Sequence, residues 1–344
     1  MASTRSAAAV PEVALPSGNA GPMPVIVLGT AVFQVPQEVT KDAVLTAIEL
    51  GYRHFDTAYM YATEKPLGEG VAARPRQVPG GGVHHLQAVE PSRSASPQIY
   101  LRGERLRSTR RSTKHREKRS ETAPLRKQTD PEYLDLYLIH FPICIKRGPY
   151  TFPAKREDAL PFDFKGVWQA MEECQRLGLA RAIGVSNFTT KHLDKMLPFA
   201  TITPAVNQVE VNPVCHQQKL RTYCAEKGIH VQAYGPLGGQ DWTGEGNPVL
   251  ESQVLAEIAK ARGKSVARVS LRWVYEQGAS FVFKTYNKER LKENLEIFDW
   301  ELTDEDRLKI SQIPQKKLTG AAFMFLPEGE FTSVDVSEIN FAEE

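Results

Sequence analysis

Residues 51–70, GYRHFDTAYMYATEKPLGEG, are the segment around which the rest of the chain is organised. Its apolar stretch 53–58 predicts a short buried strand that brings Asp56 to one end of a sheet. Tyr61 follows five residues after Asp56, and a carboxylate close to a phenol can act as an acid/base pair. An Asp that caps the next helix is the commoner explanation of such a residue, so these residues alone leave both interpretations open.

Strands and helices alternate on both sides of this segment. Apolar runs predict seven strands, at residues 23–30, 53–58, 133–140, 182–187, 205–211, 230–235 and 281–284. Amphipathic segments predict helices at residues 39–50, 163–179, 218–227, 249–261 and 266–277. Such an alternation over about 280 residues predicts an α/β fold, a (β/α)8 TIM barrel at residues 23–318.

The bulk composition is that of an ordinary soluble globular protein. The 344 residues are 41% hydrophobic and 24% charged, and a net charge of +2 does not indicate a polyanion-binding protein. The sequence contains no run of 18 apolar residues, so we predict no membrane span. Residues 1–22 are mostly small and uncharged and predict a disordered leader, while residues 319–344 form a C-terminal tail.

The four cysteines form no CxxC pair, and they stand at Cys144, Cys174, Cys215 and Cys224. This spacing argues against a zinc site or a disulfide framework and suits a reducing compartment. We therefore predict no bound metal and a cytoplasmic location.

Residues 73–127 interrupt the alternation. They contain fourteen Arg and Lys against four Glu, without a sustained apolar period. We interpret this segment as a disordered basic insertion, which leaves the third strand and its helix missing or disordered. A nucleic-acid-binding arm is a distant alternative, because the segment has one aromatic residue, Tyr100, and no zinc spacing.

A shift of reading frame offers a third interpretation of this segment. The codons allowed for residues 77–90, QVPGGGVHHLQAVE, permit the string KSREEVFITSKLW when they are read one nucleotide later. Under this hypothesis the segment is a translated wrong frame, and its positive charge carries no function.

Several motifs resemble those of the aldo-keto reductases. Residues 51–70 are similar to the family's most recognisable segment, and the shifted-frame string is similar to the segment that follows it in the family. Residues 138–142, LIHFP, resemble the family's LIHWP. The resemblance covers residues 23–72 and 131–344 and is strongest to a plant subgroup that includes deoxymugineic acid synthases and codeinone reductase-like enzymes.

The resemblance implies three catalytic residues in this chain, Asp56, Tyr61 and His140. Tyr61 would donate the proton and His140 would orient the substrate carbonyl. Phe141 stands where the family usually has Trp, and together with Tyr61 and His140 it would line the substrate pocket. The family's catalytic lysine lies on its third strand, and no lysine can be assigned to that role here.

The resemblance also implies NADPH as the cofactor. Ser186, Asn187 and Gln208 would bind the nicotinamide amide, and the ring of Tyr234 would stack on the nicotinamide. The pattern K-T-Y-N-K-E-R-x-x-E-N at 284–294 resembles the family's site for the adenosine 2′-phosphate. The full set of implied cofactor-binding residues is Gly29, Thr30, Asp56, Ser186, Asn187, Gln208, Tyr234, Lys284, Thr285, Arg290, Glu293 and Asn294.

A positively charged helix start is the ordinary explanation of the 284–294 pattern, although a helix N-terminus also attracts anions. No GxGxxG motif follows a strand, so the cofactor would not be held in the Rossmann manner. We predict a monomeric NADPH-dependent reductase of a small-molecule carbonyl compound, with a keto acid as the possible substrate. The alternative is a catalytically dead pseudo-enzyme or an incorrectly predicted product that lacks the catalytic lysine.

Overall fold

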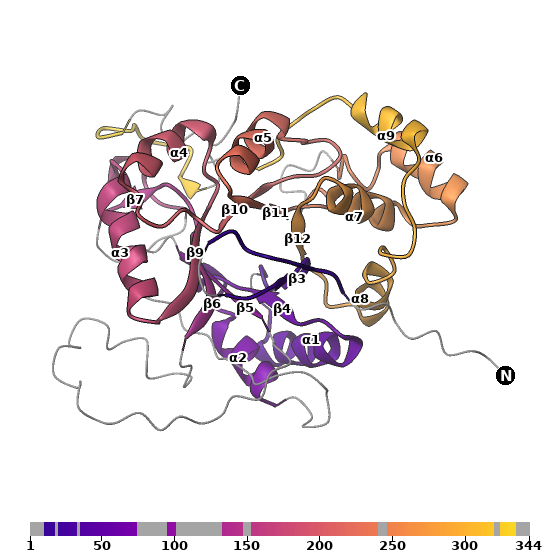
Figure 1. The fold of residues 1–344 in the computed structure, drawn as a ribbon, viewed down its shortest axis with the longest axis horizontal. Coiled ribbons are helices and arrows are strands. Elements are labelled where there is room, and N and C mark those ends of the chain that lie inside the picture. The colour runs from indigo at the N-terminus through magenta and orange to yellow at the C-terminus, as the bar shows by residue number, and fades with distance from the viewer. Residues whose placement is uncertain are drawn as a thin grey trace.

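Eight of the described strands close into a barrel at the centre of the molecule (Figure 1). The computed structural model describes residues 10–17, 20–32, 35–73, 95–100, 133–146, 153–239, 246–319 and 324–334. Around the barrel the strands are β3 (Ile26–Gly29), β4 (His54–Asp56), β5 (Ala95–Tyr100), β6 (Leu134–Ile139), β9 (Ala180–Ser186), β10 (Val206–Glu210), β11 (His230–Tyr234) and β12 (Ser280–Phe283). Strand β12 pairs with β3, so the predicted TIM barrel is confirmed.

Helices surround the barrel (Figure 1). They are α1 (Gln37–Leu50), α2 (Glu64–Ala72), α3 (Phe164–Arg176), α4 (Thr190–Met196), α5 (Gln218–Glu226), α6 (Gln253–Arg262), α7 (Val266–Glu276), α8 (Lys288–Asn294) and α9 (Asp304–Ser311). Short 3-10 turns form at Tyr59–Tyr61, Arg156–Asp158 and Leu197–Phe199. The predicted helices all form, with ends that differ by up to four residues. Helices α2 and α9 had not been predicted.

Local sequence signals explain where several helices begin and end. Gly51 ends α1 in the left-handed conformation, with φ of 107°, which costs glycine little because it lacks a Cβ atom. The Asp163 carboxylate accepts a hydrogen bond from the Gly166 N–H at 2.8 Å and so caps α3. Thr63 occupies the cap position of α2, so Asp56 is not a helix cap.

From the sequence we expect no ordered strand at the third position of the barrel, but the structure has one there. Strand β5 fills it, but β5 runs antiparallel to both neighbours, whereas the other seven barrel strands are parallel. Its backbone register pairs Asp56 with Gln98 and Ile139 with Ala95. The prediction of a missing strand is therefore corrected to a reversed one. The helix expected after it, and residues 77–90 of the reading-frame hypothesis, lie outside the described residues.

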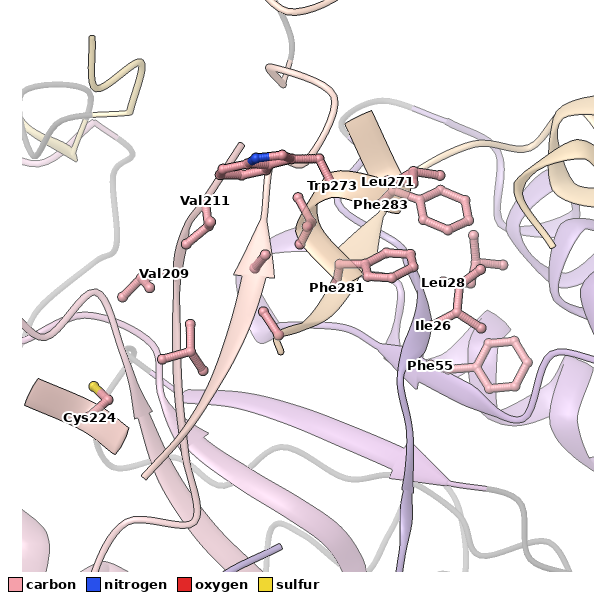
Figure 2. Close-up of a cluster of buried hydrophobic side chains, with 14 of the residues drawn as sticks. Ile26, Leu28, Phe55, Val209, Val211, Cys224, Leu271, Trp273, Phe281 and Phe283 are labelled. Atoms are coloured by element: carbon pink, nitrogen blue, oxygen red, sulfur yellow. The ribbon is translucent and has the colours of Figure 1, made fainter. Parts of the chain in front are cut away.

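A single large apolar core lies between the strands and the helices around them. Figure 2 shows the side chains of Ile26, Leu28, Phe55, Phe281 and Phe283 gathered together, from strands β3, β4 and β12. Phe55 and Phe281 are fully buried, and burial of such a side chain stabilises the fold by about 1.5–3 kcal/mol. This core holds the closing strands β12 and β3 in place.

Residues 10–17 and 20–24 pack against the barrel. Strand β1 (Glu12–Val13) pairs antiparallel with β2 (Met23–Pro24), and Val13 and Leu15 pack against a second apolar cluster that includes Met23 and Leu136. The prediction of a disordered leader is thus wrong for residues 10–17 and 20–22, because these apolar side chains pack against that cluster. The predicted strand 23–30 is split into β2 and β3.

A third apolar cluster forms beside Phe141. It joins the hairpin of β7 (Cys144–Ile145) and β8 (Ala159–Leu160) to Met324 and Phe325 of the C-terminal tail. The Arg156 guanidinium donates a hydrogen bond to the Leu326 carbonyl at 2.9 Å, which fixes the tail further. In the described part of the chain no helix is long and apolar enough to cross a membrane, and no cluster of side chains could hold a metal ion.

We predict that Gly184→Ala will destabilise the protein. A Cβ atom at Gly184 in β9 would lie 2.5 Å from the Val206 carbonyl oxygen and 2.7 Å from Leu138 Cδ2. Relieving this overlap requires the barrel strands to shift, so we expect the free energy of unfolding to fall by about 2 kcal/mol in urea titrations.

Gly178→Asn is the control for this variant. Gly178 has a φ of 71° but open space around its Cα atom, and Asn tolerates this conformation. We expect a loss below about 1 kcal/mol. Equal urea midpoints for Gly184→Ala and the wild-type protein would contradict the prediction.

Candidate functional site

Side chains from four parallel strands meet at the C-terminal edge of the barrel. Asp56 ends β4, His140 follows β6, Ser186 ends β9 with Asn187 directly after it, and Tyr234 ends β11. In parallel barrels the active site lies at this edge, because every strand delivers its C-terminal residue there. The structure therefore gathers these candidate residues at one edge of the barrel.

Tyr61 and His140 are in direct contact. The Tyr61 hydroxyl lies 3.3 Å from His140 Nε2, and the two rings meet edge to face with centroids 5.8 Å apart. Tyr61 belongs to the 3-10 turn after β4, and His140 lies directly after β6. The turn after β4 thus brings the phenol past β5 to the end of β6, within hydrogen-bonding distance of the imidazole.

Burial keeps both groups in their neutral forms. Desolvation raises the pKa of Tyr61 far above its usual value, and the charge of Asp56 raises it further. Desolvation lowers the pKa of His140 to about 4. At neutral pH the phenol therefore keeps its proton, and the imidazole is uncharged.

The Asp56 carboxylate belongs to a buried polar network. Its Oδ2 accepts a hydrogen bond from Gln208 Nε2 at 3.2 Å, and the same amide donates to Gln232 Oε1 at 2.7 Å. Asp56 is 4% exposed, and its backbone carbonyl accepts from both the N–H and the hydroxyl of Thr30 at 3.0 Å. These bonds fix the end of β4 against β3 and β10.

Asn187 links three strands at the site. Its Nδ2 donates to the His140 carbonyl at 2.9 Å, and its Oδ1 accepts from the Tyr234 hydroxyl at 2.7 Å. Its backbone has a φ of 61°, a conformation that is uncommon outside glycine and concentrates at functional sites. Through these two bonds, Asn187 holds His140 and Tyr234 in a fixed relation.

Ser186 continues the network between β9 and β10. Its hydroxyl donates to the Gln208 carbonyl at 2.8 Å and lies 3.2 Å from Asn187 Nδ2. A second set of hydroxyls lies beside Asp56, where Thr63 Oγ1 is 2.7 Å from Thr30 Oγ1 and 2.8 Å from Thr57 Oγ1. Thr30 belongs to the predicted cofactor-binding set, whereas Thr57, Thr63 and Gln232 do not, because they are common residues with no motif of their own.

Phe141 lies next to the Tyr61–His140 pair. Its ring stacks on the His140 ring with centroids 4.5 Å apart, and it packs in the third apolar cluster with Met60 and Met324. This cluster gives the site an apolar wall that includes the C-terminal tail.

Two cations stand at the end of β12, apart from this network. Lys284 and Arg290 are exposed, and Lys284 Nζ lies 5.0 Å from the centre of the Tyr286 ring. Within the described residues, Arg290 has no side-chain hydrogen bond or ion pair. Both cations are therefore accessible to an anion.

The remaining residues of the 284–294 pattern have structural contacts. Asn287 caps α8, and its Oδ1 accepts a hydrogen bond from the Arg290 N–H at 3.0 Å. Glu293 Oε1 lies 3.2 Å from Arg268 Nε in an ion pair, while Thr285 and Asn294 are buried. Gly29 lies against β12, since a Cβ there would be 3.0 Å from Val282 Cγ2.

The predicted site residues thus form two groups. The first joins Asp56, Tyr61, His140, Ser186, Asn187, Gln208 and Tyr234 at the barrel edge. The second comprises the 284–294 residues, which directly follow β12. Gly29 of β3 packs against β12 next to them. The first group can bind a polar planar ligand and hold a proton, and the second can bind an anion.

A cavity of about 300 Å³ lies at the other end of the barrel. Its lining includes Ala14, Arg221 and His230, and none of the predicted site residues contributes to it. It is therefore separate from the candidate site.

Comparison with known proteins gives one family. The sequence matches the Aldo/keto reductase family over residues 25–314. It is 46% identical over 317 residues to deoxymugineic acid synthase 1 of Oryza sativa subsp. japonica, which covers 91% of this chain and 93% of the relative. It is 48% identical over 318 residues to the 7-acetyl-epi-neemfruitin B aldo-keto reductase of Melia azedarach, covering 89% and 90%.

A solved structure shows a similar fold. The Bombyx mori aldo-keto reductase in complex with NADP is 30% identical, with a TM-score of 0.71. The similarity covers 91% of this chain and 96% of that structure.

We predict that His140 makes stability depend on pH. In the unfolded chain its pKa is near 6.5, and in the folded protein it is about 4. Between these values only the unfolded state is protonated, so the free energy of unfolding falls as the pH decreases from 6.5 to 4. The contribution of a shift of this size is up to about 3 kcal/mol.

The measurement compares the wild-type protein with His140→Gln by urea unfolding at pH 7 and pH 4.5. Because glutamine does not titrate, the variant should lose less stability on acidification than the wild-type protein. Identical losses in the two proteins would contradict the prediction.

Proposed function

The chain belongs to the aldo/keto reductase family, a family of NAD(P)H-dependent carbonyl reductases, and we propose that it reduces an aldehyde or ketone with NADPH. The observation that carries this proposal is the contact between the Tyr61 hydroxyl and His140 Nε2 at the C-terminal edge of the barrel. It supports the assignment of Tyr61 as proton donor and of His140 as the residue that orients the carbonyl oxygen.

The residues present fit NADPH. Amide and hydroxyl groups of Ser186, Asn187 and Gln208 lie together, as recognition of a carboxamide requires, and the Tyr234 ring is close to them. The exposed cations Lys284 and Arg290 suit a phosphate group. When bound, NADPH would supply the hydride for the carbonyl carbon. Gly29, Thr30, Asp56, Thr285, Glu293 and Asn294 complete the proposed binding set.

The residues of this chain would act on the carbonyl oxygen. Tyr61 holds a proton on its hydroxyl at neutral pH, because burial and Asp56 raise its pKa. His140 is neutral, so Nε2 can take part in a hydrogen bond without adding positive charge. Phe141 and the apolar cluster around it would keep water from the reacting group.

One observation favours a second function, that of an NADPH-binding pseudo-enzyme. The family resemblance places the catalytic lysine on the third strand, but β5 reads ASPQIY and contains no lysine. In the family this lysine lowers the pKa of the catalytic tyrosine, and β5 supplies no such side chain for Tyr61. On this alternative the protein would bind NADPH without turnover.

For the substrate we propose a keto acid, as in the route to a siderophore. The similarity to a deoxymugineic acid synthase at 46% identity supports this choice. We further propose a monomer in the cytoplasm, with a barrel at residues 23–318 and a tail at 319–344. The free cysteines among the described residues fit a reducing compartment.

We predict that Tyr61→Phe will abolish reduction but preserve NADPH binding. Phenylalanine keeps the ring but lacks the donor proton, so kcat should fall by roughly 10²- to 10⁴-fold. NADPH oxidation with a panel of aldehydes and 2-oxo acids, together with NADPH fluorescence titration, measures both properties. A wild-type protein that binds NADPH but oxidises none with any of these substrates would instead support the pseudo-enzyme.

We predict that Lys284 and Arg290 distinguish NADPH from NADH. Loss of one charge-assisted contact to a phosphate should raise the dissociation constant of NADPH about tenfold or more for Lys284→Ala or Arg290→Ala. The dissociation constant of NADH should change little. Lys292→Ala is the control, since Lys292 is also exposed on α8. Equal effects of Arg290→Ala on both cofactors would rule out a 2′-phosphate contact.

A further inference from the structure

The buried carboxylate of Glu210 is not explained by the proposed reaction. Glu210 ends β10 at the same edge as Tyr234 ends β11, and the two residues are register partners. Its side chain is 2% exposed, and Asn212 Nδ2 lies 3.3 Å from its Oε1. A carboxylate is rarely this buried unless its oxygens accept hydrogen bonds.

The C-terminal segment supplies those hydrogen bonds. The Leu318 N–H lies 3.1 Å from Oε1 and 3.2 Å from Oε2, and the Thr319 N–H donates to Oε2 at 2.7 Å. Burial raises the pKa of Glu210, while these amides and the charge of Lys317 lower it. Glu210 therefore holds two consecutive backbone amides in the segment that follows α9.

The loop after β10 holds the same segment a few residues earlier. The Lys316 N–H donates to the Val214 carbonyl at 2.7 Å. Gln315 accepts from the His216 N–H at 2.7 Å. The segment 315–319 is thus attached along its length to β10 and the loop that follows it.

From this segment a chain of contacts leads into the candidate site. The Thr319 side chain lies beside the Tyr234 hydroxyl, and that hydroxyl donates a hydrogen bond to Asn187 Oδ1 at 2.7 Å. Asn187 then donates to the His140 carbonyl at 2.9 Å. Glu210 is therefore connected, through Thr319, to the tyrosine ring and to the backbone of His140.

We propose that Glu210 is a positioning residue for the nicotinamide site: it fixes residues 318–319 so that Thr319 orients the Tyr234 ring on which the nicotinamide stacks. This inference rests on the proposed function, because the stacking of the Tyr234 ring on the nicotinamide is part of that proposal. Glu210 itself does not touch the cofactor. Its effect passes through the backbone of the tail.

The test uses three variants of the full chain. Glu210→Ala removes the acceptor of both amides. Thr319→Val keeps the Thr319 N–H but removes the hydroxyl that contacts Tyr234. Glu276→Gln is the matched control, since Glu276 accepts the Leu302 N–H at 2.9 Å and pairs with Arg272 and Arg307. Glu276 lies at the end of α7 that leads into the start of β12, opposite the candidate site.

Two quantities are measured on each variant. Hydrogen exchange followed by mass spectrometry reports the protection of the amides at 318–319, and it needs no cofactor. Fluorescence titration gives the dissociation constant of NADPH. Thermal melting shows that each variant is folded, and Glu210→Gln replaces Glu210→Ala if the latter is not.

The proposal predicts a distinct result for each variant. Glu210→Ala should speed exchange at 318–319 at least tenfold and raise the dissociation constant of NADPH about tenfold, as expected when a buried hydrogen-bond set is lost. Thr319→Val should weaken NADPH binding several-fold without faster exchange. Glu276→Gln should lower the melting temperature and leave both quantities unchanged.

Faster exchange in Glu210→Ala with unchanged NADPH affinity would overturn the positioning role and leave Glu210 as a tail anchor. Unchanged exchange at 318–319 in Glu210→Ala would show that Glu210 does not hold these two amides. A wild-type protein that does not bind NADPH would overturn the proposed function and, with it, the positioning role. The exchange data would still decide whether Glu210 holds the tail, so the two failures are distinguishable.

Discussion

The structure depends on the pairing of the last barrel strand with the first. Strand β12 pairs with β3 through Val282 and Val27, and the packing of Phe281 and Phe283 beside Ile26 and Leu28 keeps the two strands together. Closure of this kind removes sheet edges and fixes the strand ends relative to one another. Without it, Asp56 and Tyr234 would have no fixed relation, and the hydrogen bonds through Gln208 and Asn187 could not form together.

Much of the fold and the site follows from local patterns in the sequence. Apolar runs and caps such as Gly51 and Asp163 were sufficient for most strands and helices. The family resemblance selected Asp56, Tyr61 and His140 as candidates, and the structure brings them together at one edge of the barrel. They converge because parallel strands place their C-terminal residues at one edge, whatever the connecting segments are.

Other features could not be found in this way, because they depend on contacts between distant segments. The direction of β5 is set by its pairing with β4 and β6, and the segment 95–100 has no apolar period that would indicate a strand. Residues 10–17 adopt a fixed conformation because they pack on the barrel. Glu210 occupies an ordinary alternating position in AVNQVEV, and only the tail that reaches it more than a hundred residues later explains its burial.

The reversed direction of β5 changes the topology of the chain at the third position. In a parallel strand the carboxyl end faces the site, and the loop that follows is free to vary with substrate. In β5 the amino end, Ala95, lies beside Ile139 at that edge, while Tyr100 lies beside His54 at the opposite edge. The amino end of β5 therefore stands at the edge where the other seven strands of the barrel present their carboxyl ends.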